Sequence, residues 1–250
     1  PHLPKDLDAQ SQGVDLQGIV FVQAGAADDD WLAEAEWVTE LAATEPRIRG
    51  IVAHAPLELG DAARPHLDAL AQLPLVKGVR RLVQGEDVDF CIRPDFVHGV
   101  QLLAEYGFSF DHTIRHDQAE NSVRMAEACP DVPIVLDHFG KPPVRAGQME
   151  PWRTHLRALA ELPHVHCKLS GLATEADHDT WTCEQLRPYI DTAIEVFGAD
   201  RVFYGGDWPV STLAISYEEW IGVLDWATQD LNDEARRKLF AQNAAGFYRL

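Results

Sequence analysis

No run in this sequence reaches the roughly 18 consecutive apolar residues that a membrane-spanning helix needs. Cysteine is scarce: Cys91, Cys129, Cys167 and Cys183 form no CxxC pair and show no regular spacing. This pattern argues against a disulfide framework and predicts reduced, mostly buried thiols. There is also no charged-then-apolar leader, so we expect a cytoplasmic protein.

Basic residues are few as well. Lys and Arg total 21 against 40 Asp and Glu, which gives a formal net charge of −19 and a pI near 4.8. Such an acidic protein is repelled by nucleic-acid phosphates and by anionic membrane surfaces, so neither is expected as a partner. The hydrophobic content of 46% suffices for a sizeable core, and residues 1–250 fit one α/β domain.

The sequence does contain a repeated strand-then-helix pattern. Short apolar runs rich in Val, Ile and Phe occupy residues 19–23, 50–54, 76–84, 108–116, 133–140, 164–171 and 201–209. Helical periodicity follows them at about 28–45, 61–73, 94–106, 117–129, 150–162, 180–197, 216–229 and 232–247. Carboxylates at Asp28–Asp30 suit the start of the first of these helices. The alternation predicts a parallel sheet with crossover helices. A closed (β/α) barrel has eight strands, so one is missing from the sequence, and the N-terminal side is where we expect it.

Alternation along the strands predicts which side chains face the barrel interior. In residues 76–84, Val79 and Val83 suit the helix side, which turns Arg80 inward and leaves Arg81 near the helices. In residues 164–171, the apolar side chains suit the helix side. The inward set is then His164, His166, Lys168 and Ser170.

The same reasoning applied to residues 108–116 leaves two alternatives. Phe108, Phe110 and Ile114 suit the helix side, so the inward set is Asp111, Thr113 and Arg115. The opposite alternation would place His112 inside instead. Arg80 and Asp111, on neighbouring strands, could form an internal ion pair.

His138 and Asp207 stand at the ends of two strands, where barrels of this kind carry their catalytic groups. Each has a structural interpretation on its own: His138 as a hydrogen-bonding group, and Asp207 as a cap before the Trp-Pro turn. Together, an imidazole and a carboxylate on two strand ends are more specific. Gly205 and Gly206 beside Asp207 permit close approach of a ligand to the backbone.

Five runs carry a family resemblance: FSFDHTIRHDQ (108–118), PIVLDHFGKPPV (133–144), HCKLSGL (166–172), RVFYGGDWPV (201–210) and QNAAGFYRL (242–250). They resemble the amidohydrolase superfamily, and within it the sugar-lactonase branch with fuconolactonase, rhamnonolactonase and pyrone-dicarboxylate lactonase-like hydrolases. The resemblance implies a distorted (β/α)8 TIM barrel that opens lactone rings with water. It implies that Asp207 activates the water and that His138 ligates a metal or polarises the carbonyl. The lactone's oxygens and ring would contact Arg80, Arg115, Lys168, Asp111 and Trp208.

One departure from the family pattern concerns the metal. The family carries an HxH pair at the end of strand 1, whereas HVH at 164–166 lies in a later strand. The missing motif and the missing strand are therefore the same gap: either about 30 residues precede this sequence, the size of one βα unit, or the protein is a remnant. One divalent metal, with zinc the first choice and His138 and Asp207 among its ligands, and metal-free catalysis both remain open.

The same gap keeps two other functions open. A metal-dependent decarboxylase or amide hydrolase of the same superfamily is one, and a non-catalytic sugar-acid binding protein is the other. An incomplete barrel leaves two strand edges unpaired, which favours a homodimer.

Overall fold

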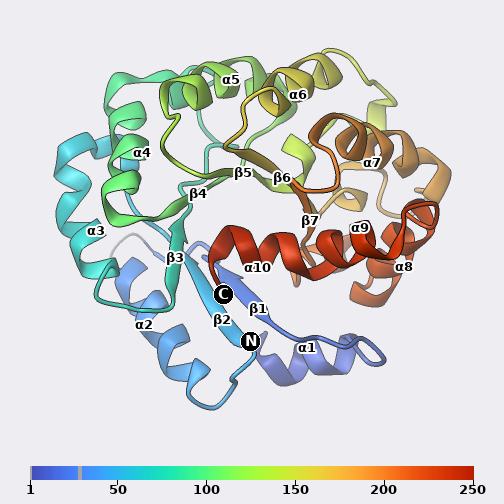
Figure 1. The fold of residues 1–250 in the computed structure, drawn as a ribbon, viewed down its shortest axis with the longest axis horizontal. Helices are drawn as coiled ribbons and strands as arrows, with labels where there is room; N and C mark the ends of the chain where they lie inside the picture. The colour runs from blue at the N-terminus through green and yellow to red at the C-terminus, as the bar shows by residue number, and fades with distance from the viewer. Residues whose placement is uncertain (1, 28–29) are drawn as a thin grey trace.

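The computed structural model describes residues 2–27 and 30–250. Its described part forms one seven-stranded parallel sheet in which each strand pairs with the next along the chain, from β1 to β7. The sheet curls into an open barrel with helices around its outside (Figure 1). The strands are β1 Ile19–Val22, β2 Ile48–Ala53, β3 Val76–Val79, β4 Ser109–His112, β5 Ile134–Leu136, β6 Val165–Leu169 and β7 Val202–Tyr204. The prediction of an α/β, TIM-barrel-like fold is confirmed.

Most of the α-helices follow the strands and cover the outer face of the sheet (Figure 1), but the first precedes β1 and the last packs inside the barrel. The α-helices are α1 Pro4–Gln10, α2 Trp31–Ala42, α3 Arg64–Leu70, α4 Pro94–Tyr106, α5 Ala119–Ala128, α6 Trp152–Ala160, α7 Cys183–Phe197, α8 Tyr217–Ala227, α9 Asp233–Arg237 and α10 Asn243–Tyr248. Thr182 and Ser216 cap α7 and α8 by accepting from the amides of Gln185 and Glu219, which satisfies donors that a helix start leaves free. Of the carboxylates expected to start α2, Asp30 directly precedes it, whereas Asp28 and Asp29 lie outside the described residues.

Short helices fill the loops that follow β2 to β7, and one more lies between α9 and α10. They are η1 Leu57–Ala63, η2 Phe90–Ile92, η3 His116–Gln118, η4 Asp137–Gly140, η5 Val144–Ala146, η6 Ala173–Glu175, η7 Val210–Leu213 and the π-helical η8 Lys238–Gln242. The segment 139–149 contains η5 and the end of η4. These loops lie at the carboxyl ends of the strands, where a βα barrel builds its site.

The main core lies between the sheet and the helices. Val165, Cys167 and Leu169 of β6 are fully buried in it, as the alternation predicted. Three of the four cysteines are buried and all four are free thiols, which confirms the expectation of no disulfide among them.

A second apolar cluster fills the interior of the barrel. Phe247 and Tyr248 of α10 pack there against Val52, Val135 and Phe203 of the strands, and α10 crosses the middle of the sheet in Figure 1. Arg249, next to this helix, donates to the carbonyl of Lys77 near the start of β3. The end of α10 therefore closes the amino end of the barrel and leaves the carboxyl end for the site.

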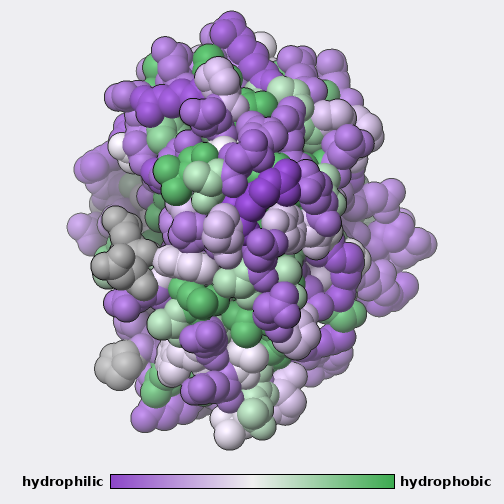
Figure 2. All heavy atoms as spheres, turned by 90° about the vertical axis from the view of Figure 1, so that its left-hand side faces the viewer, coloured by the Kyte–Doolittle hydropathy of each residue, from purple (hydrophilic) through white to green (hydrophobic). Residues whose placement is uncertain are grey.

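The surface is largely polar. Hydrophilic side chains dominate the face in Figure 2, with apolar ones scattered between them. In residues 2–27 and 30–250, no helix combines the length and the apolar character needed to cross a membrane.

Candidate active site

His138 and Asp207 meet at the carboxyl ends of β5 and β7. His138 Nε2 lies 3.8 Å from Asp207 Oδ1, and the two side chains are 9% and 14% exposed. They come from strands that are not neighbours in the sheet, so the curl of the sheet brings them together. The structure thus places an imidazole and a carboxylate side by side at the end of the barrel where catalysis is expected.

The backbone that carries both residues adopts an unusual conformation. His138, Phe139, Lys141 and Asp207 have φ between 49° and 56°, a left-handed region that costs a non-glycine residue about 1–3 kcal/mol. Such strain persists where the surroundings fix it, and it clusters at functional sites. Here the indole of Trp152 donates to the carbonyl of Phe139 at 2.7 Å, which holds the turn after β5.

Ser170 and Gly171, directly after β6, complete the contacts of the pair. Ser170 Oγ lies 2.8 Å from His138 Nδ1 and so fixes the plane of the imidazole. Gly171 has a φ of +59°, and a Cβ atom there would lie 2.5 Å from Asp207 Oδ2 and 2.9 Å from His138 Nδ1. A glycine is therefore required between the two side chains. Strand alternation predicted Ser170 inside the barrel. Gly171 was not predicted, although the Ser170–Gly171 pair within HCKLSGL was part of the resemblance.

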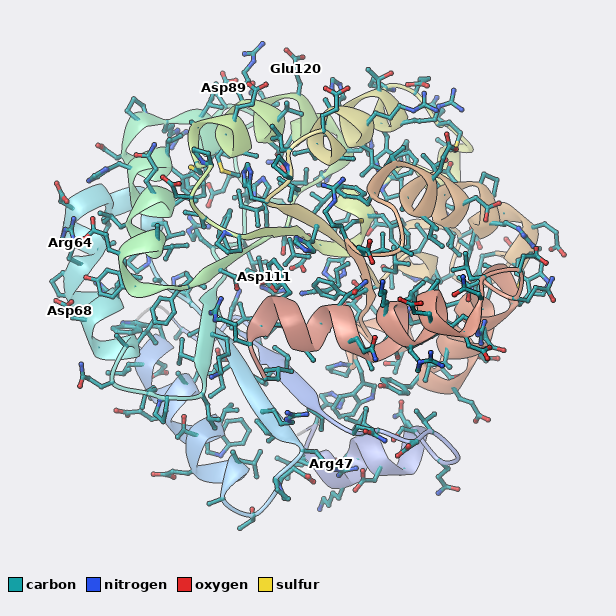
Figure 3. The ribbon with its side chains drawn as sticks, viewed as in Figure 1. Arg47, Arg64, Asp68, Asp89, Asp111 and Glu120 are labelled. Carbon is teal, nitrogen blue, oxygen red and sulfur yellow. The ribbon has the colours of Figure 1, made fainter. Side chains whose placement is uncertain are left out.

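A buried cluster of charges lies beneath the pair. Lys168 Nζ is 2.7 Å from both Asp111 Oδ2 and Asp137 Oδ1. Tyr248 donates its hydroxyl to Asp111 at 2.6 Å, so α10 reaches this cluster through the barrel interior. Figure 3 shows Asp111 near the middle of the molecule, close to α10, whereas Arg64 and Glu120 lie on the outer helices.

Asp137 joins this cluster to the turn after β5 because it directly precedes His138. Its Oδ2 accepts from Thr113 at 2.6 Å and from Arg80 at 3.3 Å. The sequence analysis placed Arg80, Thr113, Asp111 and Lys168 inside the barrel correctly. It missed Asp137, although this residue stands beside His138 in LDHFG.

These contacts shift the pKa values of the buried groups. Burial opposes the charge on Lys168, but Asp111 and Asp137 outweigh it and raise the pKa of the ammonium well above its usual value. Burial also opposes the charge on Asp137, but Lys168, His138 and Arg80 hold the pKa of this carboxyl well below its usual value. Burial lowers the pKa of His138 against the pull of Asp207 and Asp137, so we expect a neutral imidazole at pH 7.

Two of the expected orientations were wrong, and the ion pair considered for Arg80 has a different partner. Arg80 pairs with Asp137 and not with Asp111. Arg115 was expected inside the barrel, yet its side chain is 63% exposed and lies 3.8 Å from Asp117. His164 was also expected inside, yet it bonds the carbonyl of Ala126 on α5. Arg115 lies beyond the end of β4 and His164 before the start of β6, where strand alternation no longer holds.

His112 and Trp208 lie near strand ends but face different surroundings, the helices for one and the rim of the barrel for the other. His112 faces the helices, with Nε2 2.9 Å from Ser122 Oγ on α5, so the alternative that put it inside is wrong. Trp208 lies at the rim, where its indole donates to Gln10 of α1 at 3.0 Å.

The described residues do not fit a complete metal site. His138 and Asp207 are two ligand types that zinc accepts, and their facing atoms are 3.8 Å apart. A catalytic zinc takes about three protein ligands. Within residues 2–27 and 30–250, no group of three or more His, Cys, Asp or Glu side chains gathers in a way that could hold a metal.

Comparisons with known proteins agree with the fold and with the resemblance. A family model described as "Amidohydrolase" matches residues 1–250. L-Fucono-1,5-lactonase of Burkholderia ambifaria is 30% identical over 252 residues, which cover 99% of this chain and 85% of that protein. L-Fucono-1,5-lactonase of Burkholderia multivorans is 32% identical over 264 residues, covering 100% and 86%. A crystal structure of a Burkholderia multivorans amidohydrolase with bound zinc superposes with a TM-score of 0.88 at 31% identity, covering 99% of this chain and 88% of that one. The chain described here belongs to the amidohydrolase family.

Proposed function

We propose that this protein is an enzyme that opens the ring of a sugar-derived lactone with water. The observation that carries the proposal is the His138–Asp207 pair, with its facing atoms 3.8 Å apart at the carboxyl end of the barrel. The similarity to two L-fucono-1,5-lactonases supports an aldonolactone as the substrate.

In this mechanism Asp207 is the general base. Its carboxylate takes a proton from a water molecule, and the resulting hydroxide attacks the lactone carbonyl carbon. The tetrahedral intermediate then collapses, the ring C–O bond breaks, and the leaving alkoxide takes the proton back from Asp207. The proton that leaves afterwards comes from the carboxylic acid product, so turnover acidifies the solution.

His138 polarises the carbonyl in this scheme. A neutral imidazole whose Nδ1 accepts from the Ser170 hydroxyl carries its proton on Nε2, the atom that faces Asp207. That N–H can donate to the oxyanion of the intermediate, and one such donor contributes about 3 kcal/mol.

The buried cations support the site rather than bind the lactone directly. Lys168 forms ion pairs with Asp111 and Asp137, and Arg80 forms one with Asp137. Both cations lie beneath the His138–Asp207 pair. We propose that they hold Asp137 ionised and thereby fix the turn that carries His138. Trp208, at the rim beside Asp207, is the proposed contact for one face of the sugar ring.

The experiment is Asp207→Asn, assayed by proton release with L-fucono-1,5-lactone and a panel of aldonolactones, above the spontaneous rate. Loss of a general base lowers kcat by about 10²–10⁴-fold. Asp200→Asn is the matched control, because Asp200 is exposed and pairs with Lys238 away from the site. Circular dichroism verifies that both variants fold.

Activity of Asp207→Asn within tenfold of the unmodified protein contradicts this assignment. Product analysis separates the alternative reactions, since a decarboxylase releases carbon dioxide and a lactonase does not. Saturable binding of sugar acids without turnover would support the non-catalytic alternative instead.

A further inference from the structure

A second feature lies at the carboxyl end of the barrel, beside the candidate active site. It is a pocket of about 380 Å³, here called the mouth pocket, whose polar lining is Gln84, Gly85, Arg115, His116, Lys141 and Glu175. These residues follow β3, β4, β5 and β6, so four loops contribute to it. The proposed mechanism does not use this pocket.

The mouth pocket shares its loops with the catalytic pair. The backbone amide of Lys141 donates to the carbonyl of His138 at 2.8 Å. Glu175 belongs to η6, and its neighbour Thr174 donates to the carbonyl of Gly171 at 2.7 Å. The loops that line the mouth pocket are therefore bonded to His138 and Gly171, and a substrate held between His138 and Asp207 would extend toward the pocket.

The pocket carries a positive charge in a strongly negative protein. Within its lining, Arg115 and Lys141 face the carboxylate of Glu175, and the exposed Asp117 lies 3.8 Å from Arg115, whereas the chain as a whole has a formal charge of −19. Lys141 and Glu175 neutralise each other, because their charged atoms lie 2.9 Å apart and both side chains are largely shielded from water. The positive charge in excess is that of Arg115.

The guanidinium of Arg115 is exposed to solvent and forms only a long contact with a carboxylate. Its carboxylate contact, Asp117, lies 3.8 Å away, and both side chains are at least 60% exposed. Such an exposed pair contributes about 0–1 kcal/mol and yields to a better partner. Arg80 and Lys168 differ from Arg115, because they form ion pairs with buried carboxylates.

We propose that the mouth pocket binds a carboxylate of the substrate through Arg115, so that the preferred lactones carry an acid group in addition to the ring, as aldarolactones do. This inference rests on the proposed lactone-opening function of His138 and Asp207. Arginine suits the task because its planar guanidinium binds a carboxylate with two parallel hydrogen bonds. Glu175 reduces the preference for acid lactones, because its carboxylate in the same pocket repels an incoming anion.

The test compares galactonolactone and galactarolactone, which share a ring and differ only in a terminal hydroxymethyl group or carboxylate. The readout is the ratio of kcat/KM for the acid lactone to kcat/KM for the neutral one. We expect a ratio above one in the unmodified protein. Arg115→Gln should lower the ratio about 10–100-fold, the range of one charge-assisted contact. Glu175→Gln should raise it.

Arg124→Gln is the matched control, since Arg124 is exposed on α5 and pairs with Glu120 outside the pocket. A ratio below one in the unmodified protein overturns the proposal, and so does an equal loss for both lactones in Arg115→Gln. If the unmodified protein opens neither lactone, the proposed function fails, and calorimetric binding of galactarate then tests the pocket. Weaker binding by Arg115→Gln supports the pocket in that case, and unchanged binding refutes it.

Discussion

Replacing Gly171 with alanine inserts a methyl group between the two side chains of the candidate active site. The new Cβ would lie 2.5 Å from Asp207 Oδ2 and 2.9 Å from His138 Nδ1. Nonbonded carbon and oxygen atoms do not approach this closely, so both side chains must move. A displacement of about 1 Å between reacting groups lowers a rate about 10²-fold. We therefore expect Gly171→Ala to lose about 10²-fold or more in kcat.

The same substitution also has a conformational cost. Gly171 has a φ of +59°, and an alanine in this left-handed region loses about 1–2 kcal/mol of folding stability. Gly147→Ala is the matched control, because Gly147 has a φ of +63° but no atom within 4 Å of its added Cβ. It should lose a similar free energy of unfolding and keep the activity of the unmodified protein.

The assay pairs denaturant unfolding with proton release at saturating lactone. Full activity in both Gly171→Ala and Gly147→Ala would refute the reasoning, because it would mean that the spacing of His138 and Asp207 is not what sets the rate. Equal loss in both variants would show that strain in the loops, and not the clash, controls catalysis.

Two further predictions concern the buried groups. Lys168→Met leaves Asp111 and Asp137 buried without their ammonium, so the free energy of unfolding should fall by about 3–5 kcal/mol. Lys238→Met breaks only exposed pairs and should cost about 1 kcal/mol or less in the same denaturant titration; similar losses in the two variants would contradict a buried role for Lys168. Burial lowers the pKa of His112 from 6.5 to about 3, so the unfolded chain binds a proton there at a pH where the folded chain does not. His112 therefore makes stability fall as the pH falls, by about 2 kcal/mol between pH 7 and pH 5. Denaturant titrations at both pH values should give a shallower fall for His112→Gln, and an unchanged slope would rule out this origin.

The sequence predicted the sheet and the positions of His138 and Asp207 at its strand ends because both depend on local patterns. Apolar runs alternating with helical periodicity specify parallel strands, and His138 and Asp207 directly follow two of them. Alternation also placed Lys168 and Asp111 in the interior, since both lie within strands.

The errors have a physical origin as well. Arg115 was misplaced because β4 ends at His112, and the chain then leaves the plane in which alternation applies. The partner of Arg80 could not be predicted from its own strand, since Asp137 lies 57 residues away and reaches it only through the curl of the sheet. Tyr248 was missed for the same reason, because 137 residues separate it from Asp111.

The contact of Tyr248 with Asp111 has a consequence for the order of folding. The last strand of the sheet ends at Tyr204, but the helix that fills the amino end of the barrel begins only at Asn243. A nascent chain therefore contains every described strand well before it contains the side chains that pack inside them. During this interval Lys168 and Asp111 face an interior that water can still enter. We infer that final consolidation of the barrel waits for residues 247 and 248.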